Sequence, residues 1–221
     1  MRAKQARFEE IKRRTNVFDP VNDSYMKIKG KWHADYFNNK SDIVLELACG
    51  RGEYTIGMAR LFDHKNFIGV DIKGDRIWKG SSSAIEEGLS HLAFLRTDIL
   101  LLDKFFEAGE VSDIWITFPD PRPKDRDIKK RLTSPRFLDI YKRLIKPSGT
   151  IRLKTDNTTL FEYTLEVLNE RDDIVDFHHT HDLYNSELNT ECHGIRTRFE
   201  QKFNNKGHDI KYLRFSLDEK I

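Results

Sequence analysis

The order of apolar and amphipathic segments predicts an α/β fold, in which helices cover both faces of a doubly wound, mostly parallel sheet of about seven strands. Five apolar runs have the length of buried strands: residues 43–47, 66–70, 91–95, 113–118 and 150–154. Longer amphipathic stretches alternate with them and predict helices over 52–62, 75–88, 134–145 and 158–170. This alternation is typical of right-handed βαβ units, which build a parallel sheet.

The remaining elements follow from local signals. Ser134 followed by Pro135 predicts a helix start, because proline is well tolerated in the first turn and serine is a favoured cap. Residues 173–181 and 209–216 read as two further strands, which flank a polar loop over 182–197.

Composition narrows the class of protein. The chain has 221 residues, of which 38% are hydrophobic, 33% charged and 11% aromatic, as expected for one folded globular domain. It lacks an apolar run of transmembrane length, and its first residues lack the apolar core of a signal peptide. Two cysteines are too few for a disulfide framework. We therefore expect a cytoplasmic protein without a membrane segment.

The N-terminal part of the chain differs from the rest. In residues 1–40 basic side chains outnumber acidic ones, and apolar residues are sparse. We interpret this stretch as a basic extension, with one short helix before Asn16, ahead of the main domain over 41–221. A solvated tail and an arm that binds a polyanion both fit the pattern.

The loop after the first expected strand, ELACGRGEY over 46–54, has the composition of a ligand-binding turn. Gly50 and Gly52 allow a tight turn and close approach of a ligand to the helix N-terminus. The acidic Glu46 at the strand end favours a cationic amino-acid group over a pyrophosphate. A dinucleotide fingerprint fits worse, since no third glycine follows at the required spacing.

Two further acids stand at the ends of the next strands. Asp71 follows the second strand and can accept hydrogen bonds from ribose hydroxyls, whereas Asp98 follows the third and suits an exocyclic amine. Both residues could instead cap the helices that follow them. With Glu46 they converge on the carboxyl edge of the sheet, where open α/β sheets bind ligands.

The most distinctive segment is TFPDPRPKDRDIKKRL over 117–132. Its prolines stiffen the backbone around Asp120, which favours accurate placement of that carboxylate. A basic cluster follows, partly offset by Asp125 and Asp127, and indicates a polyanionic substrate such as nucleic acid. The cluster comprises Lys124, Arg126, Lys129, Lys130 and Arg131. The alternative interpretation of this basic cluster is the solvated start of a helix.

These segments resemble known families. The 46–54 loop is similar to the cofactor loop of Rossmann-like methyltransferases that use S-adenosylmethionine, with Ala48 in place of the usual first glycine. Residues 117–132 resemble the P-D-P-W-P-K and basic signature of bacterial single-subunit tRNA (guanine-N7-)-methyltransferases. LKTDN at 153–157, LFEY at 160–163 and TRFEQKFNNKGHDI at 197–210 agree with the same family. The resemblance spans about residues 42–216. Departures from it are Arg122, Asp125, Asp127 and Phe199.

The resemblance implies an activity and a site. Members of the family methylate N7 of a variable-loop guanine, position 46 of tRNA, with S-adenosylmethionine. It implies a cofactor site formed by Glu46, Gly50, Asp71, Asp98 and Asp120, with Asp120 also at the reacting end. It implies that the guanosine is held by Lys124, Asp156, Thr197, Arg198, Phe199 and Glu200. RNA contacts are expected from Arg126, Lys129, Lys130 and Arg131.

Other interpretations stay open at this point. A non-catalytic RNA-binding protein on a methyltransferase scaffold is one alternative, and another S-adenosylmethionine-dependent RNA methyltransferase is a second. We expect tRNA as the partner, no obligate protein partner, and a monomer or homodimer. We expect no metal, since the histidines near Cys192 lack the spacing of paired zinc ligands.

Overall fold

The computed structural model describes residues 3–218, which form an eight-stranded sheet with the order β1-β4-β3-β2-β5-β6-β8-β7. The strands are Val17–Phe18 (β1), Ile43–Leu47 (β2), Asn66–Asp71 (β3), Leu92–Arg96 (β4), Val111–Thr117 (β5), Ile145–Thr155 (β6), Ile174–Thr180 (β7) and Lys211–Leu217 (β8). β8 is antiparallel to β6 and β7, and the other pairs are parallel. The predicted doubly wound, mostly parallel sheet is confirmed.

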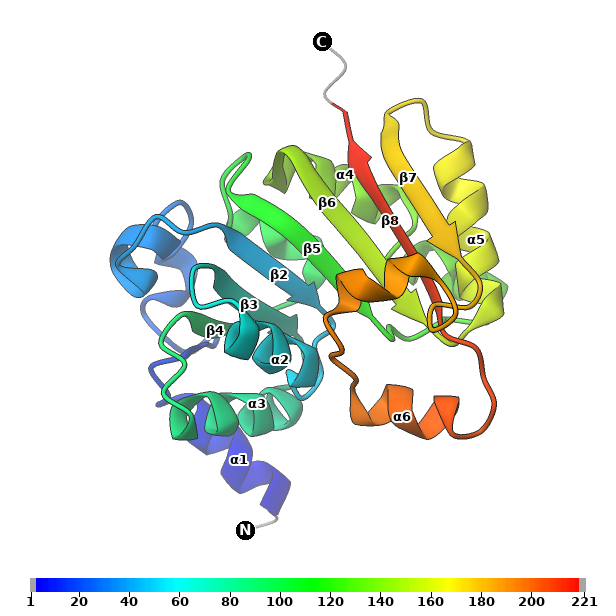
Figure 1. Ribbon diagram of the computed structural model, residues 1–221. Coiled ribbons are helices and arrows are strands. Elements are labelled where there is room, and N and C mark those ends of the chain that lie inside the picture. Colours follow the sequence, from blue (N-terminus) through cyan, green and yellow to red (C-terminus); the bar gives the residue numbers. More distant parts are fainter. Residues whose placement is uncertain (1–2, 219–221) are drawn as a thin grey trace.

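Helices cover both faces of this sheet, as Figure 1 shows. They are Ala3–Ile11 (α1), Glu53–Leu61 (α2), Gly74–Glu86 (α3), Pro135–Leu144 (α4), Thr158–Asn169 (α5) and Arg198–Asn204 (α6). Short helical turns occur at Tyr25–Lys27 (η1), Trp32–Phe37 (η2), Ile99–Lys104 (η3), Asp125–Lys130 (η4) and Glu187–Cys192 (η5). The last of these lies within the stretch expected to be a polar loop.

Alternation along the central strand separates two hydrophobic cores. Ile43, Leu45 and Leu47 of β2 face the core that α4 and α5 cover. Val44 points to the opposite core, which contains buried side chains of α2 and α3. Successive strand residues point to opposite faces, so a strand covered on both sides reads as a continuous apolar run.

The N-terminal segment is part of both cores, so the alternative of a solvated tail does not hold for its buried apolar residues. Ile11 and Val17 are buried on the α2–α3 side, whereas Tyr25 and Trp32 are buried on the other. Trp32 donates its indole N–H to the carbonyl of Phe105 over 2.8 Å. The segment wraps the β4 edge of the sheet and supplies the eighth strand, β1. Of the helices in residues 3–218, none is both long and apolar enough to cross a bilayer.

Candidate functional site

The candidate site lies where the strand order reverses. From β2 the chain builds outward through β3 and β4, and then returns to place β5 on the other side of β2. The loops that follow β2 and β5 therefore diverge at the carboxyl edge, and open α/β sheets bind ligands at such a point. These two loops carry the 46–54 and 117–132 motifs.

The loop after β2 turns through residues with positive φ, a conformation that favours glycine. Gly52 has a φ of 68°, and a Cβ there would come within 2.6 Å of the Phe94 ring. Ala48, at the position of the usual first glycine, also has a positive φ of 58°. A positive φ favours glycine, so alanine adopts this turn at some conformational cost.

Glu46 fastens this loop to the sheet. Its carboxylate accepts hydrogen bonds from the backbone N–H of Thr55 over 2.8 Å, from the Thr55 hydroxyl, and from the Thr117 hydroxyl over 2.5 Å. Only 4% of Glu46 is exposed. Burial raises the pKa of Glu46 to about 7, against the opposing effect of its hydrogen bonds from Thr117 and Thr55. The carboxylate thus joins β2, α2 and β5 at one point.

Asp71 and Asp98 differ in their surroundings. Asp71 ends β3 nearly buried, and its two oxygens accept the N–H of Gly50 and the N–H of Lys73, each over 2.8 Å. It connects the first two loops of the edge directly. Asp98 is exposed and caps η3 by accepting the N–H of Leu100 over 3.0 Å. The capping role considered for Asp98 is therefore present, and the carboxylate keeps free lone pairs.

Asp120 stands exposed in the loop after β5. Its side chain is 62% exposed and lies 3.4 Å from the guanidinium of Arg122, whose backbone N–H it also accepts over 3.2 Å. Phe118 and Arg122, on either side of it, have positive φ values of 47° and 48°. Arg131 holds the loop from beneath with hydrogen bonds to the carbonyls of Pro121 and Arg122.

The basic cluster is less available than its sequence suggests. Arg131 is 5% exposed, and its guanidinium lies 4.4 Å from the Tyr163 ring centroid, so its place indicates a structural role. Lys130 pairs with Asp127 over 2.6 Å. Lys124, Arg126 and Lys129 are exposed around η4.

Residues 197–200, at the start of α6, lie beside the Asp120 loop, although the two are far apart in sequence. The Phe199 ring is 46% exposed and packs 5.5 Å from that of Phe118. Thr197 and Glu200 form a capping box at the start of α6. Arg198 donates its backbone N–H to Glu53, the first residue of α2, over 2.7 Å. These contacts join residues 197–200 to the loops that follow β2 and β5.

A buried ion pair anchors that segment, and sequence reasoning missed one of its members. Glu200 is 0% exposed and lies 2.6 Å from the ammonium of Lys154, which is 1% exposed. The Tyr184 hydroxyl donates to the same carboxylate over 2.6 Å. Lys154 stands near the end of β6 in the LKTDN motif, and a charged residue in a buried strand was the available signal. Asp156, two residues later, is half-buried.

Within residues 3–218, no group of three or more His, Cys, Asp or Glu side chains is arranged so that it could hold a metal ion. His178 of β7 contacts Asp176, His181 in the loop after β7 contacts Glu162, and His179 lies beside the rings of Phe161 and Phe177. Both cysteines are buried and free.

Comparison with known proteins first defines the class. A family model described as "Putative methyltransferase" matches residues 40–213. The 16S rRNA methyltransferase KamB has a similar structure, with a TM-score of 0.62 and 14% identity over 90% of this chain and 95% of that one. A geranyl diphosphate methyltransferase in complex with sinefungin gives 0.51 and 14% over 90% and 84%. These structures share the fold, which is that of an α/β methyltransferase.

Sequence similarity then defines the family. A tRNA (guanine-N(7)-)-methyltransferase from Cytophaga hutchinsonii is 49% identical over 98% of both chains. The protein of the same name from Bacteroides thetaiotaomicron is 46% identical over 91% of this chain and 79% of its own length. One from Listeria monocytogenes is 38% identical over 86% of each chain. The chain belongs to the tRNA (guanine-N(7)-)-methyltransferase family.

Proposed function

We propose that this protein transfers the methyl group of S-adenosylmethionine to N7 of the variable-loop guanine, position 46, of tRNA. The observation that carries the proposal is the 49% identity, over 98% of both chains, with a relative named for that reaction. The convergence of Glu46, Asp71 and Asp120 on one sheet edge supports it independently, since a methyl transfer needs cofactor and base on the same edge.

The residues of this edge fit the cofactor. Gly50 has open space where a Cβ would stand and lies against Asp71, so a ligand can approach its backbone. We assign the ribose hydroxyls to Asp71, the adenine amine to Asp98 and the cationic methionine group to the vicinity of Glu46 and Asp120. When bound, S-adenosylmethionine supplies a methyl group on a positively charged sulfur.

The substrate supplies its own nucleophile in this proposal. The lone pair of guanine N7 forms the new bond to the methyl carbon, while the electrons of the C–S bond remain on sulfur. Positive charge moves onto the imidazole part of the base, so the protein must align the reactants and offer negative potential. Asp120 provides a carboxylate at the reacting end, and Asp156 can accept from the guanine N1–H and amine edge.

The guanosine pocket is framed by the Asp120 loop and the start of α6. Phe199 offers an exposed ring for stacking beside Phe118, and Arg198 and Lys124 offer exposed cations. Thr197 and Glu200 are buried and bonded to each other, so we assign them the task of holding these side chains in place. Before it can enter the pocket, the guanine must unstack from its neighbours in the tRNA, which costs a few kcal/mol of free energy.

Outside the pocket, exposed basic side chains provide contacts for the RNA backbone. We propose that Arg126, Lys129 and, when it leaves Asp127, Lys130 bind phosphates near η4. On the other side of the pocket, Lys202 and Lys206 are exposed around α6 and lie 5.9 and 5.4 Å from the Phe203 ring centroid. Folded RNA is recognised mainly through shape and phosphate, which suits two such basic surfaces.

The test is methyl transfer from labelled S-adenosylmethionine to an unmodified tRNA transcript, followed by nucleoside analysis. We expect 7-methylguanosine with the normal transcript and none when the variable-loop guanine is replaced by adenine. Methylation at another nucleoside would favour a different RNA methyltransferase. Binding of tRNA without cofactor binding or transfer would favour the non-catalytic scaffold.

A further inference from the structure

A residue of the neighbouring strand β4, Arg96, supports the loop between β3 and α3. Asp71 ends β3, α3 begins at Gly74, and the carbonyl of Ile72 between them accepts a hydrogen bond from Arg96 Nε over 3.3 Å. Arg96 is the last residue of β4, the neighbouring strand. Its side chain therefore reaches across the edge and holds the backbone next to the Asp71 carboxylate.

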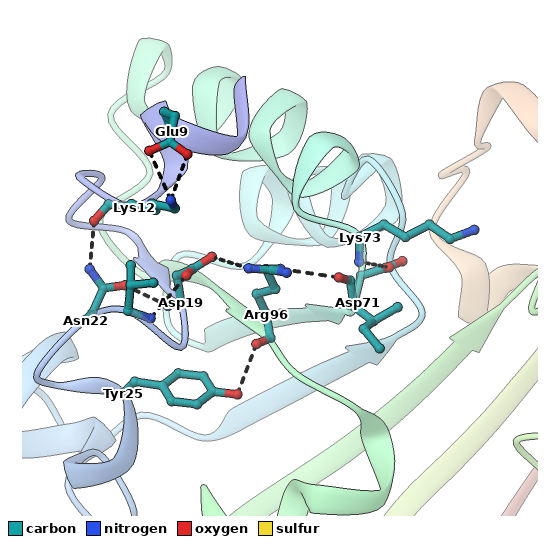
Figure 2. A network of polar contacts seen from close by, with 10 residues as sticks. Glu9, Lys12, Asp19, Asn22, Tyr25, Asp71, Lys73 and Arg96 are labelled. Atoms are coloured by element: carbon teal, nitrogen blue, oxygen red, sulfur yellow. Dashed lines mark hydrogen bonds and ion pairs between the residues drawn. The ribbon is translucent and has the colours of Figure 1, made fainter. Parts of the chain in front are cut away.

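Arg96 is itself held by the N-terminal segment, as Figure 2 shows. Its guanidinium lies 3.0 Å from the carboxylate of Asp19, which is 0% exposed. The Phe8 ring lies 4.5 Å from the guanidinium carbon, and the Tyr25 hydroxyl donates to the Arg96 carbonyl over 3.1 Å. Because Asp19 is fully buried while the Arg96 side chain is 23% exposed, loss of the arginine leaves a buried carboxylate without its cation.

The network continues into the N-terminal segment. Asn22 accepts the backbone N–H of Asp19 and donates to the carbonyl of Lys12, each over 2.8 Å (Figure 2). A second contact does not involve Arg96: a Cβ at Gly74 would come within 2.5 Å of Ile11 Cδ1. The end of α1 thus packs directly against Gly74, the first residue of α3, whereas Asp19 reaches the Ile72 carbonyl only through the Arg96 side chain.

We infer that Arg96 is a positioning residue of the cofactor site, and that docking of residues 8–25 and cofactor binding strengthen each other. The inference rests on the proposed function, which places the cofactor ribose on Asp71. Without the Arg96 guanidinium, the Ile72 carbonyl loses its anchor and Asp19 is left buried without its cation. Coupling of this kind is reciprocal, so a cofactor that favours the ordered loop must favour the docked segment equally.

The first measurement is the dissociation constant of S-adenosylhomocysteine for the full chain, by titration calorimetry. We expect Arg96→Met to weaken binding about tenfold, the size associated with losing one hydrogen bond to a charged group. Arg96→Lys should recover part of the loss, because an ammonium keeps the charge but not the planar fork that serves Asp19 and Ile72 together.

Tyr36→Phe is the matched control. Tyr36 also belongs to the N-terminal segment and donates to the carbonyl of Leu92 over 2.9 Å, at the opposite end of the same strand, β4. It should lower the melting temperature without changing the dissociation constant. Equal affinity of Arg96→Met and Tyr36→Phe would overturn the inference. If Arg96→Met does not fold, Asp19→Asn is measured against the same control and should also weaken binding.

Limited proteolysis gives a second readout that a purely structural role would not move. S-adenosylhomocysteine should slow cleavage within residues 8–25 of the wild-type protein, and this protection should shrink in Arg96→Lys. Unchanged cleavage at saturating ligand would contradict the coupling. A wild-type protein that binds no S-adenosylhomocysteine would instead overturn the proposed function together with the inference.

Discussion

The two sides of the carboxyl edge are built in different ways. On the side proposed to bind the cofactor, here called the cofactor side, Glu46 and Asp71 are held by backbone N–H groups from residues 9 and 21 positions away. On the side proposed to bind the guanosine, here called the substrate side, α6 reaches the Asp120 loop and β6 through contacts between distant parts of the chain. Phe118 meets Phe199 there, and Lys154 meets Glu200.

This difference separates local geometry from tertiary anchoring. A carboxylate that is hydrogen-bonded within neighbouring βα units is held in position whenever the sheet folds. Residues 197–200 are instead anchored by the pair of Lys154 and Glu200, whose side chains are 1% and 0% exposed. We therefore expect loss of the Lys154–Glu200 pair to lower the free energy of unfolding, and substitution of Glu46 to change how that free energy depends on pH.

The largest effect is expected from Lys154→Met. The substitution leaves the Glu200 carboxylate buried without its cation, which typically costs about 3–5 kcal/mol of unfolding free energy. Urea denaturation measures the loss. The double variant Lys154→Met/Glu200→Gln should recover part of it, since it removes the uncompensated charge. A loss below about 1 kcal/mol would mean that the pair is solvated in solution. Cofactor affinity of the folded variant should stay within about twofold.

Glu46 gives the corresponding test on the cofactor side. Its pKa is raised to about 7, above the ordinary 4.5, because burial disfavours the charged form. The folded state therefore favours the protonated carboxyl, so the contribution of Glu46 to stability is greatest below about pH 4.5 and falls as the pH rises to about 7. Two to three pKa units correspond to about 3 kcal/mol.

Glu46→Gln isolates this contribution. The variant keeps a side chain of the same shape but does not titrate, so its unfolding free energy relative to wild type should rise by about 3 kcal/mol between pH 4.5 and pH 8. Denaturation of the cofactor-free protein at both pH values measures the difference. A difference independent of pH would show that the Glu46 pKa is not raised.

The contrast between the two sides also explains which parts of the fold and of the candidate site could be predicted from the sequence. Each βα unit has its own strand run, turn and helix, so the strand ends bearing Glu46, Asp71 and Asp98 could be placed without tertiary information. The N-terminal segment could not, because Ile11, Val17 and Trp32 follow neither a helical nor a strand period. Its burial depends on the exposed edge of β4, which the sequence of the segment does not encode.

The substrate side was predictable only in part. The motif around Asp120 identified a stiff loop, but not that Arg131 would be buried beneath it. Lys154 and Glu200 are 46 residues apart in sequence, and their pairing brings α6 against the end of β6. Charge alone favoured solvent-exposed positions for Arg131, Lys154 and Glu200, and tertiary packing placed all three inside.

Asp120→Asn should lower the rate of methyl transfer with little effect on stability. The carboxylate is 62% exposed, so the folded protein does not depend on it. Loss of one preorganised electrostatic group at a reacting centre commonly lowers the rate about a hundredfold. Single-turnover transfer at saturating tRNA and cofactor measures this step, and Asp125→Asn, in the same exposed stretch, is the control. A rate within about threefold of wild type would exclude a reacting-end role for Asp120.

The smallest effect is expected from removing lysines of the two basic surfaces, one around η4 and one around α6. Lys130 shares its charge with Asp127 over 2.6 Å, whereas neither Lys202 nor Lys206 has an acidic ion-pair partner within residues 3–218. Free cations contribute more to phosphate binding, because they release counterions without first breaking a pair. Lys202→Ala/Lys206→Ala should therefore raise the KM for tRNA about fivefold and reduce the salt slope by about 2, one unit for each lost phosphate contact. Lys129→Ala/Lys130→Ala should change both quantities less, and the opposite ranking would assign the main RNA surface to η4.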